Sequence, residues 1–285
     1  MSSAVSVEGL RKTYGQVEAV RGVTFEIGAG EVFGILGPNG AGKTTTVEIL
    51  EGYRERDAGT VSVLGEDPNE AGRAWRGRIG VVLQSSATYD LLTVRELLEL
   101  FRGYYERPLA VDEVVTLIGL GEKRDARVRT LSGGQKRRMD LGIALVGDPE
   151  LLFLDEPTTG FDPEARRRAW ETIRSLRSLG KTILLTTHYL EEAERLCDRV
   201  AVLAHGEIAA LGHPGELTGA LPPTEIRFRR NGEQVVLRTE EPTRVLHELT
   251  AEALAAGAEL EALEVRRPSL EEVYLSLTGA EEAAE

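Results

Sequence analysis

One stretch decides the fold class of this chain: Gly37-Pro38-Asn39-Gly40-Ala41-Gly42-Lys43-Thr44, a complete match to the pattern G-x-x-x-x-G-K-[ST]. The apolar run Glu31–Leu36 predicts a short strand before it, and a helix is predicted from Lys43 onward. Glycines let a backbone wrap closely around a phosphate, and the N–H groups of the loop and the helix start supply partial positive charge. A structural glycine turn is the alternative, but the full octet between a strand and a helix favours phosphate binding.

The residues that end this loop suit a nucleotide that carries Mg²⁺. Lys43 would reach the β- and γ-phosphates, and Thr44 would ligate the metal ion. Thr45, the next residue, belongs to the same candidate nucleotide-binding set. The loop therefore predicts a nucleotide and Mg²⁺ as ligands.

Two adjacent acids follow a second apolar run, Leu151–Leu154. A strand buried on both faces has no reason to end in Asp155 and Glu156 unless these carboxylates meet a cation or water at its carboxyl end. Asp155 suits the Mg²⁺ shell, and Glu156 suits the base that polarises the attacking water. A solvated acidic turn would be the interpretation of these residues alone, but the phosphate loop makes the catalytic interpretation the stronger one.

His188 directly follows the predicted strand Thr182–Thr187, so we expect it at the same sheet edge as Lys43 and Asp155. Spacing alone leaves a packing or capping role open for this histidine.

A second glycine pair stands in Leu131-Ser132-Gly133-Gly134-Gln135, which opens a predicted helix. Ser132 and Gln135 form a capping-box pattern, so a purely local interpretation exists. Two glycines in a first helical turn cost about 1 kcal/mol each relative to alanine, however, and a cap gives no reason for them. They are expected if a ligand approaches the backbone closely, which makes this helix start a second anion site. The chain cannot use that site on the nucleotide that its own Lys43 holds.

The order of predicted strands and helices gives an α/β fold with a second, smaller domain. We place the first domain at residues 1–218 and an α+β domain at 219–285, joined by a short Gly/Pro-rich linker. The other predicted strands are Val5–Leu10, Val17–Ile27, Val200–Leu203, Glu207–Leu211, Glu225–Arg229, Gln234–Arg238 and Glu261–Val265. The other predicted helices are Leu91–Tyr105, Val111–Leu120, Thr243–Ala256 and Ser269–Leu277.

The charge balance limits the possible partners. Asp and Glu total 47 against 34 Lys and Arg, a formal net charge of −13, so nucleic-acid binding is not expected. The single cysteine, Cys197, cannot form an internal disulfide.

Apolar runs are only a few residues long, whereas a membrane-spanning helix needs about 20. If the protein acts on a membrane, another chain must cross it.

Together these motifs resemble the nucleotide-binding subunit of ATP-binding cassette (ABC) transporters, over residues 5 to about 215. The motifs that match in order and approximate spacing are Gly37–Thr44, the signature pentapeptide Leu131–Gln135, Leu151–Glu156 and His188. The resemblance implies a P-loop NTPase fold of the ABC type, with a mixed-sheet core, a β-subdomain and a helical subdomain at about 85–148. It also implies ATP, with Mg²⁺, as the ligand.

The resemblance implies roles for further residues. Tyr14 matches the aromatic residue that stacks on adenine, and Gln84 matches the glutamine that contacts Mg²⁺ and water. Asp162 matches the loop acid that communicates between subunits, and His188 matches the switch histidine that contacts the γ-phosphate.

The resemblance also implies a second copy of the chain as partner. Two such subunits pair head to tail when ATP is bound, so Ser132 and Gly134 of one copy would complete the site held by Lys43 of the other. Gly133 and Gln135 belong to the same candidate set.

Separate transmembrane permease subunits are the other implied partners, and they would hold the chain at the cytoplasmic face of the membrane. In the family they dock near the helical subdomain, where the candidates are Tyr89, Leu91, Phe101 and Tyr104. An apolar stripe at helical spacing is also explained by internal packing.

The segments Leu151–Pro163 and Arg267–Gly279 resemble antibiotic- and drug-efflux subunits of the ABC-2 type, which implies export of a drug, an antibiotic or a lipid-like substrate. A motor for an importer, and a soluble ABC ATPase acting on ribosomes or DNA, are the alternatives. The single cassette, the negative charge and the short Gln84–Leu131 region disfavour the soluble ATPase. A binding module without hydrolysis is disfavoured by the presence of Glu156 and His188.

Overall fold

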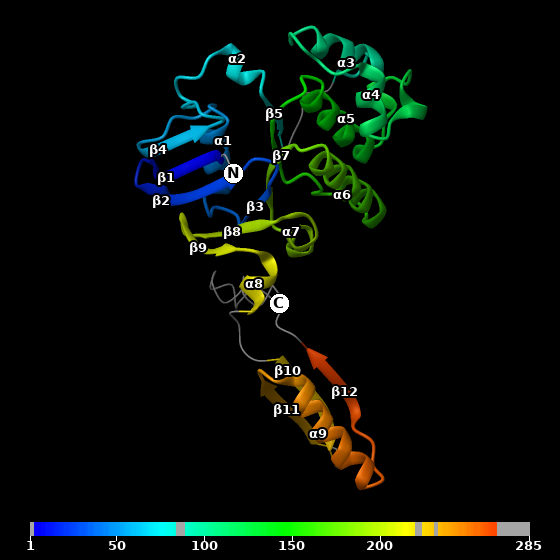
Figure 1. Cartoon of the computed structure of the whole chain (residues 1–285). Coiled ribbons are helices and arrows are strands. Elements are labelled where there is room, and N and C mark those ends of the chain that lie inside the picture. The colour runs from blue at the N-terminus through cyan, green and yellow to red at the C-terminus, as the bar shows by residue number, and fades with distance from the viewer. Residues whose placement is uncertain (1–2, 84–88, 220–223, 231–232, 267–285) are drawn as a thin grey trace. The chain divides into compact units, whose positions relative to one another are not determined.

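The computed structural model describes residues 3–83, 89–219, 224–230 and 233–266. The chain forms two compact units, Met1–His213 and Pro214–Glu285. This division falls a few residues before the boundary that the sequence predicts, and no sheet of the described residues has strands from both units (Figure 1).

The centre of the first unit is a mixed six-stranded sheet in the order β5-β6-β7-β3-β8-β9. Neighbouring strands from β5 to β8 are parallel, and β9 pairs antiparallel with β8. All residues of β3 and β7 are buried, which explains their nearly uninterrupted apolar or β-branched sequences. The bounds are β3 Val32–Leu36, β5 Ile79–Val82, β6 Leu151–Asp155, β7 Thr182–Thr187, β8 Arg199–Ala204 and β9 Glu207–Gly212.

This strand order brings three carboxyl ends together. Strand β3 pairs with β7, and β7 pairs with β6, all in parallel. The phosphate loop after β3, His188 after β7 and the acids at the end of β6 therefore lie along one edge of the sheet. The pairing confirms the prediction that His188 shares an edge with Lys43 and Asp155.

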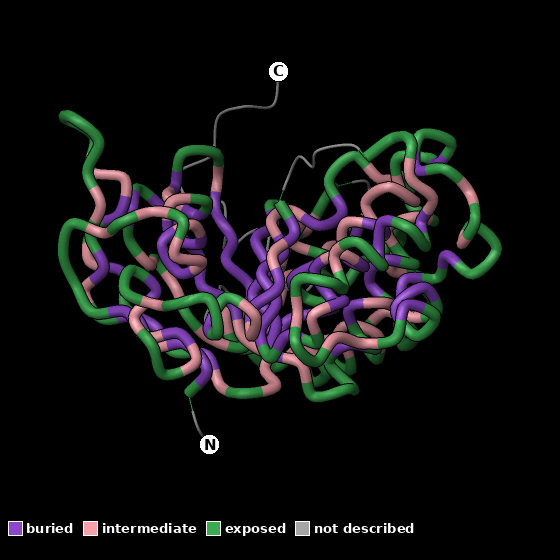
Figure 2. The backbone as a smooth tube through the Cα atoms, turned by 90° about the horizontal axis from the view of Figure 1, so that it is seen from above, coloured by how far each residue is buried: buried purple, intermediate pink, exposed green. Residues whose placement is uncertain are grey.

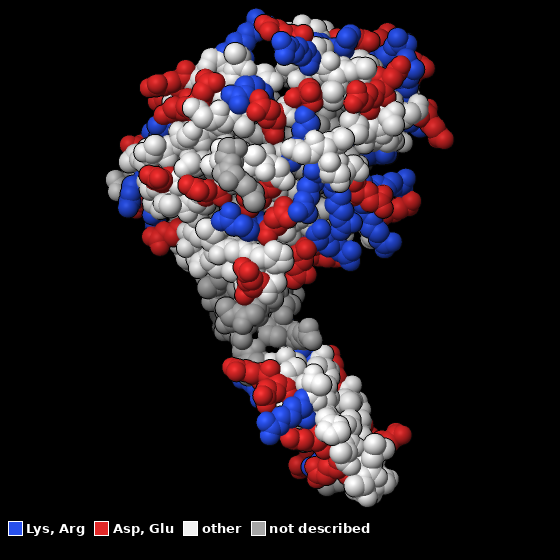
Figure 3. Space-filling model, viewed as in Figure 1, with Lys and Arg blue, Asp and Glu red and all other residues white. Residues whose placement is uncertain are grey.

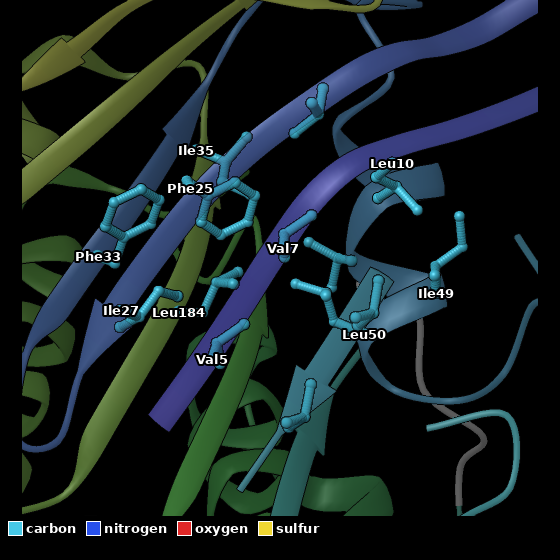
Figure 4. Close-up of a cluster of buried hydrophobic side chains, with 14 of the residues drawn as sticks. Val5, Val7, Leu10, Phe25, Ile27, Phe33, Ile35, Ile49, Leu50 and Leu184 are labelled. Atoms are coloured by element: carbon cyan, nitrogen blue, oxygen red, sulfur yellow. The ribbon is translucent and has the colours of Figure 1, made fainter. Parts of the chain in front are cut away.

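A second, three-stranded antiparallel sheet has the order β2-β1-β4, with β1 Ser3–Tyr14, β2 Val17–Gly28 and β4 Ala58–Val63. Its buried face, helix α1 (Lys43–Leu50) and the central sheet share one hydrophobic core, part of which is shown in Figure 4. The rings of Phe25 and Phe33 stack there with centroids 5.2 Å apart. Figure 2 shows the buried residues running through the middle of this unit.

The helical subdomain contains α3 (Val94–Arg102), α4 (Val111–Leu117) and α5 (Gly133–Leu145), with short 3₁₀ turns at Gly121–Lys123 and Val128–Thr130. Helix α3 begins later than the predicted Leu91 because Thr93 and Glu96 form a complete capping box that fixes its start, and it ends before the predicted Tyr105. Leu97 and Leu98 are buried and pack this subdomain together.

Three further helices complete the first unit: α2 (Arg73–Arg76), α6 (Pro163–Ser178) and α7 (Leu190–Leu196). Acidic and basic side chains are interspersed on the face shown in Figure 3, and basic side chains gather over α6, which contains Arg166, Arg167 and Arg168. Among the described residues, no helix combines the length and apolar character that crossing a membrane requires.

The second unit is α+β. Its antiparallel sheet has the order β11-β10-β12, with Ile226 and Phe228 buried. The bounds are α8 Pro214–Gly219, β10 Thr224–Arg230, β11 Glu233–Thr239, α9 Pro242–Ala255 and β12 Glu261–Arg266. The predicted helix Ser269–Leu277 lies outside the described residues.

Candidate active site

The phosphate loop joins β3 to α1 and has no room for side chains at two of its glycines. A Cβ on Gly37 would lie 2.5 Å from the carbonyl oxygen of Leu203, and a Cβ on Gly42 would lie 2.4 Å from that of Ala19. Gly42 also has a φ of 99°, in the left-handed region. Packing within the chain therefore demands glycine at both positions.

Lys43 is nearly buried at the start of α1, with 7% of its surface exposed. Its ammonium group donates hydrogen bonds to the carbonyl oxygens of Gly37 (2.7 Å) and Pro38 (3.1 Å). Burial lowers the pKa of Lys43, while the charges of Glu156 and Asp155 oppose that shift. The buried cation thus faces the two acids across the sheet edge.

The first turn of α1 keeps donors available for an anion. The helix's own hydrogen bonding begins where the Thr46 N–H donates to the Gly42 carbonyl at 2.9 Å, so the preceding N–H groups have no acceptor within the helix. Thr44 is exposed and Thr45 is partly buried. A glycine cradle, N–H groups without an acceptor in the helix and a nearby ammonium group fit the phosphates of a nucleotide.

The acids at the end of β6 are held by β7. Thr186 Oγ1 donates to Asp155 Oδ1 (2.5 Å) and accepts from the backbone N–H of Glu156 (3.0 Å). Glu156 has a φ of 45°, a conformation that costs a non-glycine residue about 1–3 kcal/mol and is typical of functional sites. Thr186 thereby holds the side chain of Asp155 and the backbone of Glu156 together.

The carboxylate of Glu156 contacts both His188 and Thr159. Its Oε1 lies 3.3 Å from His188 Nδ1, and its Oε2 accepts a hydrogen bond from Thr159 Oγ1 at 3.0 Å. The Glu156 side chain is 12% exposed and that of His188 is 39% exposed. His188 therefore lies beside Glu156 with part of its ring open to solvent.

At the start of α5, the capping box predicted from the sequence is confirmed. Ser132 Oγ accepts from the Gln135 N–H (3.3 Å), and Gln135 Oε1 accepts from the Ser132 N–H (2.9 Å). Among the described residues, a Cβ on Gly133 would meet no atom within 4 Å, and one on Gly134 would meet Ala165 Cβ at an ordinary 3.5 Å. Packing within the chain therefore explains the cap but not the two glycines.

A cleft of about 610 Å³ lies beside this helix start. Its lining includes the signature residues 132–135, together with Glu156, Gly160 and Asp162. Asp162 caps α6 by accepting from the N–H groups of Glu164 (3.0 Å) and Ala165 (2.9 Å), and these hydrogen bonds lower its pKa. The loop after Glu156 thus borders the signature helix.

One predicted site residue, Tyr14, lies apart from this arrangement, and another, Gln84, has no described position. Tyr14 is exposed at the end of β1, with the Lys12 ammonium 5.7 Å and the Arg54 guanidinium 5.2 Å from its ring centre. Gln84 lies outside the described residues, so its contacts with Mg²⁺ and water stay a prediction.

The aromatic residues suggested for docking form a small surface cluster. The ring centroids of Tyr89 and Phe101 are 5.7 Å apart, and those of Phe101 and Tyr104 are 6.0 Å apart. Leu91 and Tyr104 remain 73% and 61% exposed. The cluster is thus partly internal packing and partly open surface.

Sequence reasoning missed Arg137 of α5. Its guanidinium group donates to the backbone carbonyls of Leu83, of Asp155 (2.6 Å) and of Glu156 (3.4 Å). Burial lowers its pKa. Arg137 thereby ties the signature helix to the strand that carries both acids. These three acceptors are backbone atoms, so no residue pattern marks them.

A phosphate loop with two acids and a histidine at adjacent parallel strand ends defines a nucleoside-triphosphate hydrolase. The ABC transporter family profile matches residues 20–159, and a profile for the C-terminal domain of ABC transporter domain-containing proteins matches residues 214–269. The Nod factor export ATP-binding protein I of Rhizobium sp. (strain N33) is 42% identical over 98% of both chains. The chain therefore belongs to the ABC transporter family, as an ATP-hydrolysing, nucleotide-binding subunit.

Two solved structures are similar over most of the first unit. The ADP conformation of MJ1267, an ATP-binding cassette of an ABC transporter, aligns with a TM-score of 0.67 at 26% identity, covering 76% of this chain and 93% of that chain. The dimeric post-hydrolysis state of the cassette MJ0796, bound to ADP and Pi, aligns with a TM-score of 0.66 at 26% identity, covering 73% and 98%. These matches establish the ABC ATPase fold.

Proposed function

We propose that two copies of this chain bind ATP between them, head to tail, and that hydrolysis drives export through separate membrane subunits. The dimeric site is proposed from the two glycines at the start of α5. Neither backbone conformation nor packing among the described residues requires glycine at Gly133 and Gly134. A phosphate of the nucleotide on the partner copy provides the missing reason. The dimeric cassette MJ0796 supports this arrangement.

Each copy contributes two sets of residues to the proposed sites. Residues 37–45 of one copy, with Lys43, hold the phosphates, and Ser132 with residues 133–135 of the other copy closes over them. Tyr14 stacks on adenine, and Asp162 lies at the contact between the copies. Asp162 already borders the signature helix through the shared cleft.

The chemistry is assigned to the sheet edge. Glu156 orients and deprotonates the attacking water. His188, whose Nδ1 lies 3.3 Å from Glu156 Oε1, contacts the γ-phosphate. Thr44, Asp155 and Gln84 would hold Mg²⁺, which neutralises charge developing on the phosphates. Thr186 keeps Asp155 and Glu156 in place through the hydrogen bonds described above.

Export of a lipid-like or antibiotic-like compound is the transport reaction we propose. The similarity to a Nod factor export protein over 98% of both chains supports export, and it extends through the C-terminal unit. Resemblance of the sequence to ABC-2 drug-efflux subunits supports the same direction. Permease subunits would hold the chain at the cytoplasmic face of the membrane, with the Tyr89, Phe101 and Tyr104 cluster as a candidate contact.

Glu156→Gln tests the active site directly. We expect ATP hydrolysis to fall roughly 10²–10⁴-fold, because the base is lost, while ATP binding is retained. Uncleaved ATP should then hold two copies together, so size-exclusion chromatography with light scattering should show a dimer in ATP and Mg²⁺. The control is Glu150→Gln, an exposed glutamate at the other end of β6 that pairs with Arg78 at 2.6 Å. A Glu156→Gln variant that stays monomeric in ATP would contradict the dimeric site.

The export proposal has its own test. Purifying the chain from membranes with its bound partner should recover a polytopic permease encoded as a separate chain. Reconstitution of both chains in vesicles should give ATP-dependent movement of a lipid-like compound away from the ATPase side. Movement toward that side would support the importer alternative instead.

A further inference from the structure

Glu192 is a fully buried carboxyl group that the proposed chemistry does not use. It lies on α7, four residues after His188, and has 0% of its surface exposed. Glutamate is rarely buried unless partners hold it, because removing a carboxylate from water is costly. Burial raises its pKa, and the hydroxyl and indole hydrogen bonds it receives oppose the shift.

The partners of Glu192 come from the segments on either side of the active site. Glu192 Oε1 accepts hydrogen bonds from Thr158 Oγ1 (2.8 Å) and from Trp170 Nε1 of α6 (3.0 Å). Thr158 is itself fully buried and lies in the turn between Glu156 and Asp162. One carboxylate oxygen therefore connects the turn that carries the base, helix α6 and the helix that follows His188.

The turn anchored by Thr158 is tightly connected to the base. The Thr159 N–H donates to the Glu156 carbonyl at 3.2 Å, and the Phe161 N–H donates to the Thr158 carbonyl at 3.1 Å. On the other side, the Glu192 N–H donates to the Tyr189 carbonyl at 3.1 Å, one residue after His188. A shift of Thr158 is thus transmitted toward Glu156 and His188 together.

The second oxygen, Glu192 Oε2, is buried with no hydrogen bond of normal geometry among the described residues, and the same holds for Nε of Arg166 on α6. The hydroxyl of Thr187, the last residue of β7 and the neighbour of His188, nevertheless lies close enough to lower the pKa of Glu192. A carboxylate kept only for stability is expected to have both oxygens satisfied, since an unpaired buried acceptor costs about 1–3 kcal/mol. Glu192 thus keeps acceptor capacity next to β7, α6 and the turn at Thr158.

We infer that Glu192 is a positioning residue that couples the turn at Thr158, and through it the subunit contact at Asp162, to the Glu156–His188 pair. The inference rests on the proposed roles of Glu156, His188 and Asp162. Movement of the turn when the second copy docks would then set the 3.3 Å contact between the base and the histidine. Glu192 touches neither nucleotide nor water in this role.

The test uses the full-length chain and three variants: Thr158→Val, Glu192→Ala and the double variant. Valine matches threonine in shape and removes only the hydroxyl donor. We expect kcat for ATP hydrolysis to fall roughly tenfold or more in each single variant, because small displacements of catalytic groups are costly. KM for ATP and the Kd of a fluorescent ATP analogue should change less than about twofold, since Lys43 and its loop are untouched. The double variant should be no slower than the slower single variant, because both changes break one connection.

The control is Glu191→Ala on the same helix, an exposed glutamate that pairs with Arg195 at 3.0 Å. Glu192→Gln should recover much of the activity, because its amide oxygen can still accept from Thr158 and Trp170. Normal kcat per folded molecule in Thr158→Val, with only a lower melting temperature, would reduce Glu192 to a structural anchor and overturn the inference. Glu156→Gln is measured in the same assay: if it hydrolyses ATP normally, the active-site assignment fails instead.

Discussion

Two helix starts in the first unit carry glycines for different reasons. In the phosphate loop before α1, carbonyl oxygens of neighbouring strands lie where the side chains of Gly37 and Gly42 would be, and Gly42 has a left-handed φ. At the start of α5, Gly133 has open space around it and no unusual φ among the described residues. Packing within one chain thus explains the glycines of the phosphate loop, whereas it does not explain Gly133.

Gly42→Ala should have the largest effect on the intact chain. The new Cβ would lie 2.4 Å from the Ala19 carbonyl, and φ would be strained as well. We expect the free energy of unfolding to drop by about 3 kcal/mol or more, with ATP binding lost, as measured by urea denaturation and nucleotide titration.

Gly40→Ala is the matched control for Gly42→Ala. Gly40 also has a positive φ, 80°, but a Cβ there would meet no atom within 4 Å among the described residues. Only the conformational cost of about 1–2 kcal/mol is then expected. Equal losses of stability in the two variants would show that close packing does not explain the phosphate-loop glycine.

Gly133→Ala should separate activity from stability. Alanine favours a helix by up to about 1 kcal/mol over glycine, so the unfolding free energy should stay level or rise. A methyl group facing the partner's phosphate should nevertheless reduce hydrolysis and ATP-dependent dimerisation, with kcat/KM falling roughly tenfold to a hundredfold, as judged by phosphate release and light scattering.

Gly72→Ala is the control for this second variant. Gly72 also stands at a helix start, as the N-cap of α2, with a φ of −86° and open space for a Cβ among the described residues, but it belongs to no proposed site. Its activity should be unchanged. If Gly133→Ala is as active as Gly72→Ala, the contrast between the two helix starts has no functional meaning.

Local patterns predicted the elements that position the active site. The strands β3, β6 and β7 are continuous apolar or β-branched runs, and the loop, the acids and His188 follow them directly, so strand order alone placed them together. Strands β4 and β5 were missed. Strand β5 has only four residues. Strand β4 contains Gly59, whose backbone lies so close to Gly9 that a Cβ on Gly59 would lie 2.5 Å from the carbonyl oxygen of Gly9. Such short or glycine-containing strands are stabilised by neighbours rather than by their own sequence.

The residues that support the site could not be predicted in the same way. Arg137 binds carbonyl groups of strands and loops remote in sequence, and any residue type could supply those acceptors. Glu192 stands in the acidic run Glu191–Glu194, which is typical of an exposed helix. Its burial depends on how α7 packs against α6 and the turn at Thr158, which is a tertiary property. The start of α3 was predicted wrongly at Leu91, although the T-x-x-E pattern at Thr93 marks the observed start in the sequence.

Glu51, at the end of the helix that follows the phosphate loop, offers a test with a smaller expected effect: whether packing within one chain buries this region. Burial, followed by the charges of Asp155 and Glu48, raises the pKa of this carboxyl group at the end of α1 from 4.5 to about 8. Between these pH values the folded chain holds a proton that the unfolded chain has released, so the unfolding free energy should fall as pH rises, by at most about 1.4 kcal/mol per pH unit. Glu51→Gln should remove this slope in urea denaturation of the nucleotide-free protein, whereas Glu55→Gln, at an exposed position, should keep it. A slope that survives in Glu51→Gln would mean that other groups control the pH response, and that the end of α1 is more open to solvent than the packing indicates.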